Sequence, residues 1–462
     1  MYTKWIDLRN EILFDAAPER FGQVCSEMMN RLSKEFNNSD SKKQEEIAQL
    51  LTDIAIDLQS YLPKWHLLTN ANKGLLSEEK IIQESKKMLE LVEKWGYGKK
   101  ASLAQKMISS FKESKLIELS VKADQGEINN RWGNDNGLGI MEAMRRGAAL
   151  VTTNPPIVNM AREERPDVFD RIRDDIKKRY ADEPVERRIS RLTMNVVLNN
   201  CRALRRVYEI TKHELGYVNY QVNPKNFKDA GKMAEEIKFA YDEMTKALGG
   251  KPNVVFKVPG TKASIETVKT VTAMGIGVNI TVNFSVPQSI AFAKAIEEGS
   301  AEKSYLTIMA GRLDDPIASE LEGKGVVNAK ELSRWASRAV TGRVYNGVLL
   351  KNGYKKSEIL VASLRGPWNF DASITDGMKS RIVISSFPDK AEDYDGSQGE
   401  IVSHINEPVP ENIEKELRKS DIFVKAYDMD GMKPDGFDSY IPVVQTLTSF
   451  IEVYGKLENY MR

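Results

Sequence analysis

The residue of this sequence best suited to covalent chemistry is a lysine inside a short apolar run, Val254-Val255-Phe256-Lys257-Val258-Pro259. If the run is a strand and the lysine points into a core, burial disfavours the ammonium form, and the pKa of Lys257 falls. A neutral amine is a nucleophile that attacks carbonyl carbons and forms a Schiff base. Alternatively, Lys257 faces outward or extends to the rim as an ordinary cation. Spacing alone does not choose between the two.

Polar side chains also stand on or directly after several other apolar runs. They are Asp124, the Thr153-Asn154 pair, Asn219 with Gln221, and Asn279 with Thr281. Residues two apart share one face of a strand, so each of the last two pairs points in one direction. Singly, each residue is typical of a hydrogen-bonded polar group in a core. Their recurrence at strand ends predicts a shared pocket.

Two arginines and a serine follow later runs of the same kind. Arg312 stands in Ala310-Gly311-Arg312, and Ser363 precedes Arg365 in Ala362-Ser363-Leu364-Arg365. Two guanidinium groups and a hydroxyl form a plausible clamp for a phosphate. The alternative is a pair of surface arginines in ordinary salt bridges.

The elements that must position these residues alternate between short apolar runs and amphipathic segments. The runs are 117–121, 149–153, 217–222, 254–258, 278–282, 305–309, 359–363 and 382–385. Such alternation predicts parallel strands joined by crossover helices. Eight units over residues 116–462 favour a (β/α)8 TIM barrel, with an open doubly wound sheet as the alternative. In a barrel, the polar residues named above would meet at the carboxyl ends of the strands.

Residues 1–115 show helical patterns only. Ile47, Leu50, Leu51, Ile54 and Leu58, for example, form one apolar stripe at helical spacing. We expect an all-helical extension packed on the barrel, with an oligomerisation arm or a lid as alternatives, so a homo-oligomer is left open. Ser439–Leu457 reads as a last long helix, and Asp389–Gly399 reads as a loop.

Composition excludes several classes of function. The 67 basic and 66 acidic side chains give a net charge of +1, so no overall field attracts nucleic acid or an anionic membrane. The chain has no apolar stretch of about 18 residues that would span a membrane. Its amino terminus has no apolar signal core, so we expect a soluble, cytoplasmic protein.

Metal and dinucleotide sites are not indicated either. The cysteines, Cys25 and Cys201, and the histidines, His66, His213 and His404, are scattered along the chain, without ligand spacing. Gly137-Leu138-Gly139 lacks the third glycine of a dinucleotide fingerprint. We interpret it as a loop after the first strand.

Taken together, the strand ends resemble the transaldolase family. The segments that carry the resemblance are Ala123–Ile128, Val151–Pro155, Phe256–Thr261, Gly277–Gln288, Ala310–Arg312 and Ala362–Arg365. Thr152-Thr153-Asn154-Pro155 is the most specific of them. The match runs in chain order from about residue 117 to the end, and leaves the amino-terminal helices uncovered.

The resemblance implies a transaldolase that transfers or cleaves the dihydroxyacetone unit of a ketose phosphate, in carbohydrate metabolism and the pentose phosphate pathway. Lys257 would form the Schiff base, so neither a cofactor nor a metal is needed. Asp124 would handle the proton of the hydroxyl at the cleaved bond, while Thr281 and Gln221 would orient a water. The substrate-binding residues would be Thr153, Asn154, Asn279, Thr307, Arg312, Ser363 and Arg365.

Two positions depart from the family pattern. Gln221 stands where transaldolases carry glutamate, and glutamine is neither an acid nor a base. Fructose-6-phosphate aldolases also have glutamine there, which favours an aldolase. Met309, however, matches neither the aldolase tyrosine nor the transaldolase phenylalanine. The alternatives are therefore an aldolase, a non-catalytic sugar-phosphate-binding barrel, and an enzyme for a different anionic sugar.

Overall fold

The computed structural model describes residues 2–62, 64, 76–377 and 380–462. Within these residues, eight parallel strands close into a barrel in chain order, with the last strand paired to the first. The strands are β1 (Asn130–Asn134), β2 (Leu150–Val151), β3 (Tyr217–Gln221), β4 (Val254–Pro259), β5 (Val278–Thr281), β6 (Ser304–Met309), β7 (Ser357–Ala362) and β8 (Ile382–Ser386). The (β/α)8 barrel is confirmed, and the open sheet is excluded.

The first strand lies elsewhere than predicted. Residues 117–121 belong to helix α7 (Lys115–Gln125), which begins with the Ser114 side chain as its cap and ends at Gly126 in the left-handed region, φ +78°. Leu116, Leu119 and Ala123 form a buried stripe at helical spacing. The prediction of a strand at 117–121 was therefore wrong, because a short apolar segment fits either period.

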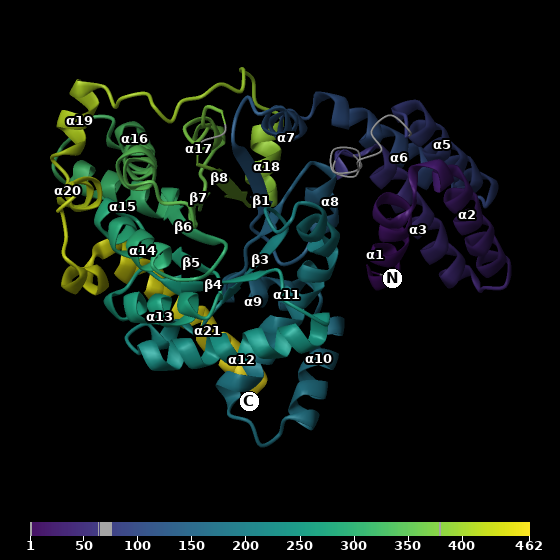
Figure 1. The fold of residues 1–462 in the computed structure, drawn as a ribbon, viewed down its shortest axis with the longest axis horizontal. Coiled ribbons are helices and arrows are strands. Elements are labelled where there is room, and N and C mark those ends of the chain that lie inside the picture. Colours follow the sequence, from purple (N-terminus) through teal and green to yellow (C-terminus); the bar gives the residue numbers. More distant parts are fainter. Residues whose placement is uncertain (1, 63, 65–75, 378–379) are drawn as a thin grey trace.

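Helices surround the barrel and cover its rim (Figure 1). They are α8 (Ile140–Arg145), α9 (Pro155–Glu164), α10 (Pro166–Arg179), α11 (Val185–Ile210), η4 (Pro224–Asn226), α12 (Ala230–Leu248), α13 (Lys262–Ala273), α14 (Val286–Glu297), α15 (Ala310–Gly323), α16 (Ala329–Arg343), η5 (Val344–Leu350), α17 (Pro367–Asp371), α18 (Pro388–Asp395), α19 (Glu411–Leu417), α20 (Asp421–Tyr427), η6 (Pro434–Ser439) and α21 (Ile441–Met461). Helix α21 confirms the predicted last helix, with Pro442 in its first turn. Helix α18 replaces most of the loop expected at 389–399.

The amino-terminal helices stand beside the barrel, next to α7 and α8 (Figure 1). They are α1 (Tyr2–Asn10), η1 (Glu11–Asp15), η2 (Pro18–Arg20), α2 (Phe21–Asn37), α3 (Ser41–Gln59), α5 (Glu78–Lys94), α6 (Gly98–Ser110) and η3 (Phe111–Glu113). The predicted stripe of α3 is buried, from Ile47 to Leu58. Because α7 is also helical, the helical region extends to Gln125 before the barrel begins.

A buried charge network joins these helices to the barrel. Arg145, on α8, is only 1% exposed. Its guanidinium donates to the Asp57 carboxylate at 2.7 Å and to Asp53 at 3.1 Å, both on α3. Trp5 of α1 donates its indole N–H to the other Asp57 oxygen at 2.6 Å. The extension is thus fixed to the start of the barrel by groups from three helices.

Arg145→Met is expected to lower the free energy of unfolding by ~3 kcal/mol, because it leaves the Asp57 carboxylate buried without its cation. A urea titration followed by circular dichroism measures this loss. The neighbouring Arg146 is half-buried and pairs with Asp395 at 3.2 Å, so Arg146→Met is expected to cost less than about 1 kcal/mol. Equal losses in the two variants would contradict a special role for Arg145.

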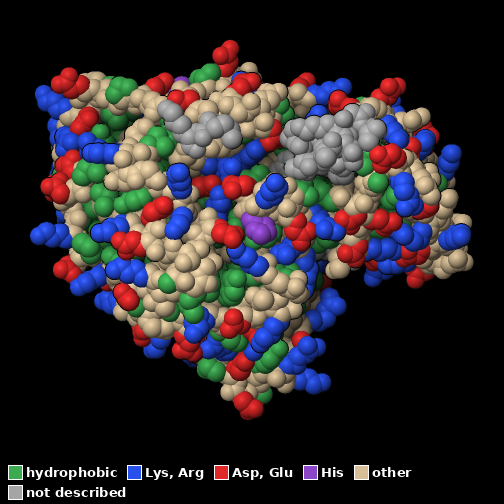
Figure 2. All heavy atoms as spheres, in the orientation of Figure 1, with side chains coloured by type: hydrophobic (Ala, Val, Ile, Leu, Met, Phe, Trp, Pro, Cys, Tyr) green, Lys and Arg blue, Asp and Glu red, His purple; other side chains and the backbone are tan. Residues whose placement is uncertain are grey.

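Acidic and basic side chains are interspersed over the face seen in Figure 2. No helix of the described residues is both long and apolar enough to cross a membrane. Among these described residues, no three Asp, Glu, His or Cys side chains lie together in a way that could hold a metal ion. Cys25 and Cys201 are buried and free, while His66 lies outside the described residues.

Candidate active site

Lys257 points into the barrel from β4 and is only 5% exposed. Its neighbours in register are Gln221 on β3 and Asn279 on β5. Burial lowers the pKa of Lys257, and the Asp135 carboxylate opposes that shift. The amine makes no hydrogen bond or ion pair with any described residue. The outward orientation is therefore excluded, and burial makes the neutral, nucleophilic form of Lys257 more accessible than that of a free lysine.

Asp135 is the carboxylate that interacts with Lys257. It directly follows β1, is buried, and donates its backbone N–H to Ser386 at 2.8 Å. Its side chain accepts from the Thr152 hydroxyl, which lies 2.7 Å from that of Ser385. Burial raises the pKa of Asp135, while Lys257, Thr152 and Arg312 lower it. The strand ends thus hold a buried carboxylate that interacts with the amine.

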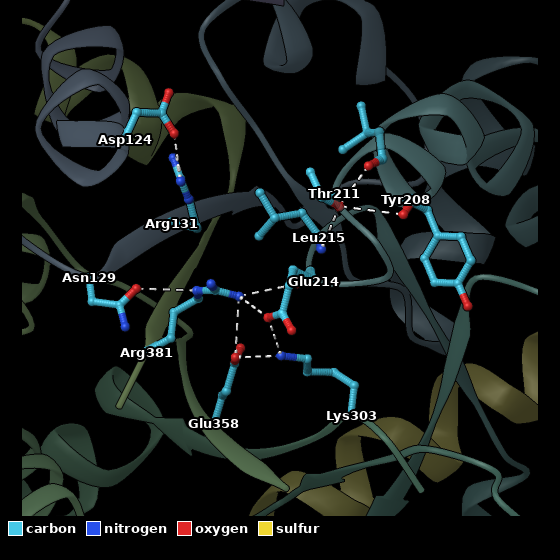
Figure 3. Close-up of polar contacts among 11 residues, drawn as sticks. Asp124, Asn129, Arg131, Tyr208, Thr211, Glu214, Leu215, Lys303, Glu358 and Arg381 are labelled. Atoms are coloured by element: carbon cyan, nitrogen blue, oxygen red, sulfur yellow. Dashed lines mark hydrogen bonds and ion pairs between the residues drawn. The ribbon is translucent and has the colours of Figure 1, made fainter. Parts of the chain in front are cut away.

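Asp124 does not reach this site, contrary to the prediction. It lies on α7 and pairs with Arg131, near the amino end of β1, with 2.6 Å between Oδ1 and Nη2. Figure 3 shows Asp124 pointing toward Arg131 and separate from the group formed by Arg381, Glu358, Glu214 and Lys303. Asp124 is therefore at the opposite end of the barrel from the carboxyl ends of the strands. The misplaced first strand caused the error.

Sequence reasoning also missed Asp135, Thr152 and Ser385. A signal for Asp135 was present, because the polar segment Asn134-Asp135-Asn136 precedes the glycine loop. If the first strand is placed at residues 130–134, Asp135 falls directly after its carboxyl end. Thr152 could also have been found, because alternate residues of a strand point to the same side. At that spacing Thr152 lies on the side of Leu150 and of Asn154, which was already a predicted site residue.

The amide residues on β3 and β5 are held by a chain of hydrogen bonds. Asn279 donates from Nδ2 to Asn219 Oδ1 at 2.6 Å and accepts from the Thr307 hydroxyl at 2.6 Å. The Thr153 hydroxyl donates to the Asn219 carbonyl at 2.5 Å. Thr153 and Thr307 thus use their hydroxyls to position neighbouring groups.

Three further predicted residues stand at the same end of the barrel. Thr281 is the last residue of β5, and its hydroxyl contacts the Met309 sulfur at 3.8 Å. Asn154 caps α9 by accepting from the Ile157 N–H at 2.9 Å, so its NH2 group is available. Gln221 ends β3 beside Lys257. The structure thus brings Lys257, Gln221, Thr281, Asn154 and Asn279 to one end of the barrel.

The predicted anion-binding residues are also neighbours. Arg312, in the first turn of α15, is half-buried and makes no hydrogen bond or ion pair with the described residues. Its guanidinium carbon lies 5.5 Å from the centre of the Phe450 ring. Burial and the nearby Arg365 lower the pKa of Arg312. An anion bound here would relieve both effects.

Arg365 and Ser363 complete this side of the site. Ser363 has φ +58°, and its carbonyl accepts from the Gly311 N–H at 3.0 Å. A Cβ on Gly311 would lie 2.6 Å from the Arg365 guanidinium carbon, so the Arg365 side chain packs directly over Gly311. Arg365 already pairs with Asp315 at 2.8 Å. Arg312 is therefore the cation left unpaired.

Arg312→Met is expected to raise KM for a ketose phosphate about 10- to 100-fold, through loss of a charge-assisted contact to phosphate. Steady-state kinetics measure this change. Borohydride trapping of dihydroxyacetone, which has no phosphate, serves as the control and should be unchanged. A similar loss with both compounds would place Arg312 in the chemistry or the fold instead of in phosphate binding.

These features define a class of protein: a (β/α)8 barrel with a buried, unpaired lysine inside it and arginines beyond the later strands. The chain matches the model of the Transaldolase/Fructose-6-phosphate aldolase family over residues 139–377, which is more than half of its 462 residues. It belongs to this family. The match begins just after Asp135 and contains every predicted site residue except Asp124.

Individual relatives agree with this assignment. The chain is 26% identical over 289 residues to a transaldolase of Thiobacillus denitrificans, covering 57% of this chain and 78% of the relative. A transaldolase of Mycolicibacterium smegmatis is 27% identical over 284 residues, which cover 56% of this chain and 74% of that protein. Transaldolase 2 of a Nostoc species is 31% identical over 174 residues, or 35% and 44% of the two chains.

Proposed function

We propose that this protein is a transaldolase-type enzyme that forms a Schiff base between Lys257 and the carbonyl of a ketose phosphate. The observation that carries the proposal is the state of Lys257, which is buried inside the barrel without a hydrogen-bond or ion-pair partner among the described residues. Family membership and the names of the relatives support the same chemistry. No cofactor is needed, because the protonated imine accepts the electrons of the broken bond.

The covalent steps fall to Lys257 and Asp135. The amine attacks the ketose carbonyl, and loss of water gives the iminium. Asp135 then takes the proton of the hydroxyl on the second carbon beyond the imine carbon. The bond between that carbon and the carbon adjacent to the imine breaks, and its electrons form a neutral enamine on Lys257. The aldehyde leaves, and an acceptor aldehyde reverses these steps. Asp135 thus takes the role predicted for Asp124, because it is the carboxylate near Lys257.

The remaining residues bind and orient. The side-chain amides of Asn154 and Asn279 bind the hydroxyls of the three-carbon unit. Thr281 and Gln221 orient the water that is lost and regained at the imine. Arg312, assisted by Ser363 and Arg365, binds the phosphate at the far end of the sugar.

A second function within the family is favoured by Gln221. Its amide takes up no proton, and fructose-6-phosphate aldolases also carry glutamine at this position. An aldolase would release the three-carbon unit to water, whereas a transaldolase passes it to an acceptor. The two functions share the imine on Lys257 and differ in the fate of the enamine. A non-catalytic sugar-phosphate-binding barrel would form no imine at all.

The test is reduction with borohydride in the presence of fructose 6-phosphate, followed by peptide mass spectrometry. A three-carbon adduct on Lys257 is the expected result. Product analysis with and without an aldose phosphate then distinguishes the functions, since transfer requires the acceptor and an aldolase releases dihydroxyacetone without it. Binding of ketose phosphates without any adduct on Lys257 would refute the proposed enzyme and favour the binding protein.

A further inference from the structure

A small cavity adjoins the carboxyl end of β3, between the barrel and helices α9, α11, α12 and α21. Its volume, taken as the space open to the centres of water molecules, is about 10 Å³, which is room for about one water. The lining residues that matter here are Asn154, Ser190, Gln221, Glu236 and Tyr454. The cavity therefore connects two residues of the proposed active site with groups from the surrounding helices.

Two of these residues have a buried oxygen without a hydrogen-bond partner among the described residues. They are Gln221, through Oε1, and Tyr454, through its hydroxyl. The two side chains are 7% and 4% exposed. A buried polar atom left unpaired costs about 1–3 kcal/mol, and both residues line the same cavity. Its geometry indicates a shared hydrogen-bonding partner of the size of a water molecule.

The third polar group at the cavity is the carboxylate of Glu236, on α12. It accepts from the Tyr220 hydroxyl at 3.1 Å, the Asn223 N–H at 2.9 Å and the Ser190 hydroxyl at 3.2 Å. These three donors fix it in place. Glu236 and Ser190 also line a surface groove, so this carboxylate lies between the cavity and solvent. A water in the cavity would thus have acceptors on two sides and a route for exchange.

We propose that one water molecule, bound between the Tyr454 hydroxyl, Gln221 Oε1 and the Glu236 carboxylate, orients the Gln221 amide for the reaction at Lys257. The tyrosine donates to the water, and the water donates to the amide oxygen and to the carboxylate. This arrangement satisfies both unpaired oxygens. Tyr454 and Glu236 are then positioning residues, which act on the reaction through Gln221.

The orientation matters because the two ends of an amide are chemically opposite. With Oε1 bound in the cavity, the Nε2 group of Gln221 faces the barrel interior, where Lys257 is its neighbour in register. That N–H donates to the oxygen that leaves as water when the imine forms. A reversed amide would present an acceptor there instead. The inference rests on the proposed function, since it assumes an imine at Lys257.

Tyr454→Phe tests the inference, because it removes the hydroxyl and keeps the ring. We expect kcat, or the rate of borohydride-trapped adduct formation where turnover is slow, to fall about tenfold as the amide loses its fixed orientation. KM should stay within about twofold. The matched control is Tyr460→Phe on the same helix, whose hydroxyl bonds to Asp170 at 2.7 Å, and it should leave the rate unchanged.

The decisive comparison repeats Tyr454→Phe in a Gln221→Ala background. Without an amide to orient, the tyrosine hydroxyl should have no further effect on the rate of adduct formation. The same tenfold loss in both backgrounds would show a merely structural role and overturn the inference. So would an unchanged rate in the single variant.

A crystal structure gives a second readout that does not depend on activity. The expected result is a water within hydrogen-bonding distance of both Gln221 Oε1 and the Tyr454 hydroxyl, whereas a direct bond between the two side chains would overturn the inference. Failure of the proposed function has a different signature, namely no adduct on Lys257 in the unmodified protein. An adduct combined with a Tyr454 effect that is independent of Gln221 would refute only the water-mediated orientation.

Discussion

Lys257→Met is expected to abolish borohydride trapping of ketose phosphates and to lower turnover by on the order of 10⁴-fold or more, as loss of a covalent nucleophile does. Methionine is apolar and similar in length, so it fills the same buried space on β4. Because burial disfavours the ammonium form of Lys257, the variant should be at least as stable as the unmodified protein. Trapping, turnover and thermal unfolding measure these three results.

The matched control is Lys262→Met. Lys262 is exposed, stands at the start of α13 just beyond β4, and pairs with Asp435 at 2.5 Å. Its loss should leave trapping and turnover unchanged. An adduct that persists in Lys257→Met, or that maps to Lys262 in the unmodified protein, would contradict the assignment of the nucleophile.

The pH dependence of trapping follows from the same environment. The pKa of Lys257 is lowered from its usual 10.5, so the neutral amine becomes the major form at a lower pH than for a free lysine. The rate of adduct formation should therefore rise with pH and level off below pH 10.5. A rate that continues to rise through that value would show that the amine is not buried as described.

Seven of the eight strands were predictable because each is an apolar, β-branched run between turn signals. The exception, β1, reads Asn-Arg-Trp-Gly-Asn and carries a single large apolar residue. It tolerates Arg131 because Asp124 pairs with that guanidinium at the amino end of the barrel. Close by, Arg381 and Lys303 share the Glu358 carboxylate (Figure 3). Glu358 stands 55 residues from Lys303 and 23 from Arg381, so no local pattern predicts this second group of charges.

The candidate site was predictable to a similar extent, and for similar reasons. Lys257, Asn279 and Thr281 lie on strands whose period of two fixes the direction of each side chain. The surroundings of Gln221 depend instead on Glu236 and Tyr454, from helices α12 and α21. Their meeting with β3 is a tertiary contact, which spacing along the chain does not specify. The same holds for the pairing of Arg365 with Asp315, whereas Arg312 forms no ion pair with any described residue.

The choice between Asp135 and Asp124 is the point at which sequence and structure give opposite expectations. Asp135→Asn is expected to lower kcat about 10²- to 10⁴-fold, the usual range for loss of a general acid–base group. Asparagine keeps the size of the side chain and still accepts from Thr152, so the fold should be retained. The carboxylate also raises the pKa of Lys257; its removal should shift the plateau of the trapping rate to lower pH.

Asp124→Asn is the matched variant, with the opposite pattern of effects. Its side chain is half-buried beside Arg131, at 2.6 Å, so removal of the negative charge should lower the free energy of unfolding by about 1–3 kcal/mol. At a temperature where both proteins are folded, kcat should stay within about twofold of the unmodified enzyme. If Asp124→Asn lost activity while Asp135→Asn kept it, the cleavage step could not depend on the carboxylate nearest Lys257, and the arrangement of catalytic groups proposed here would be wrong.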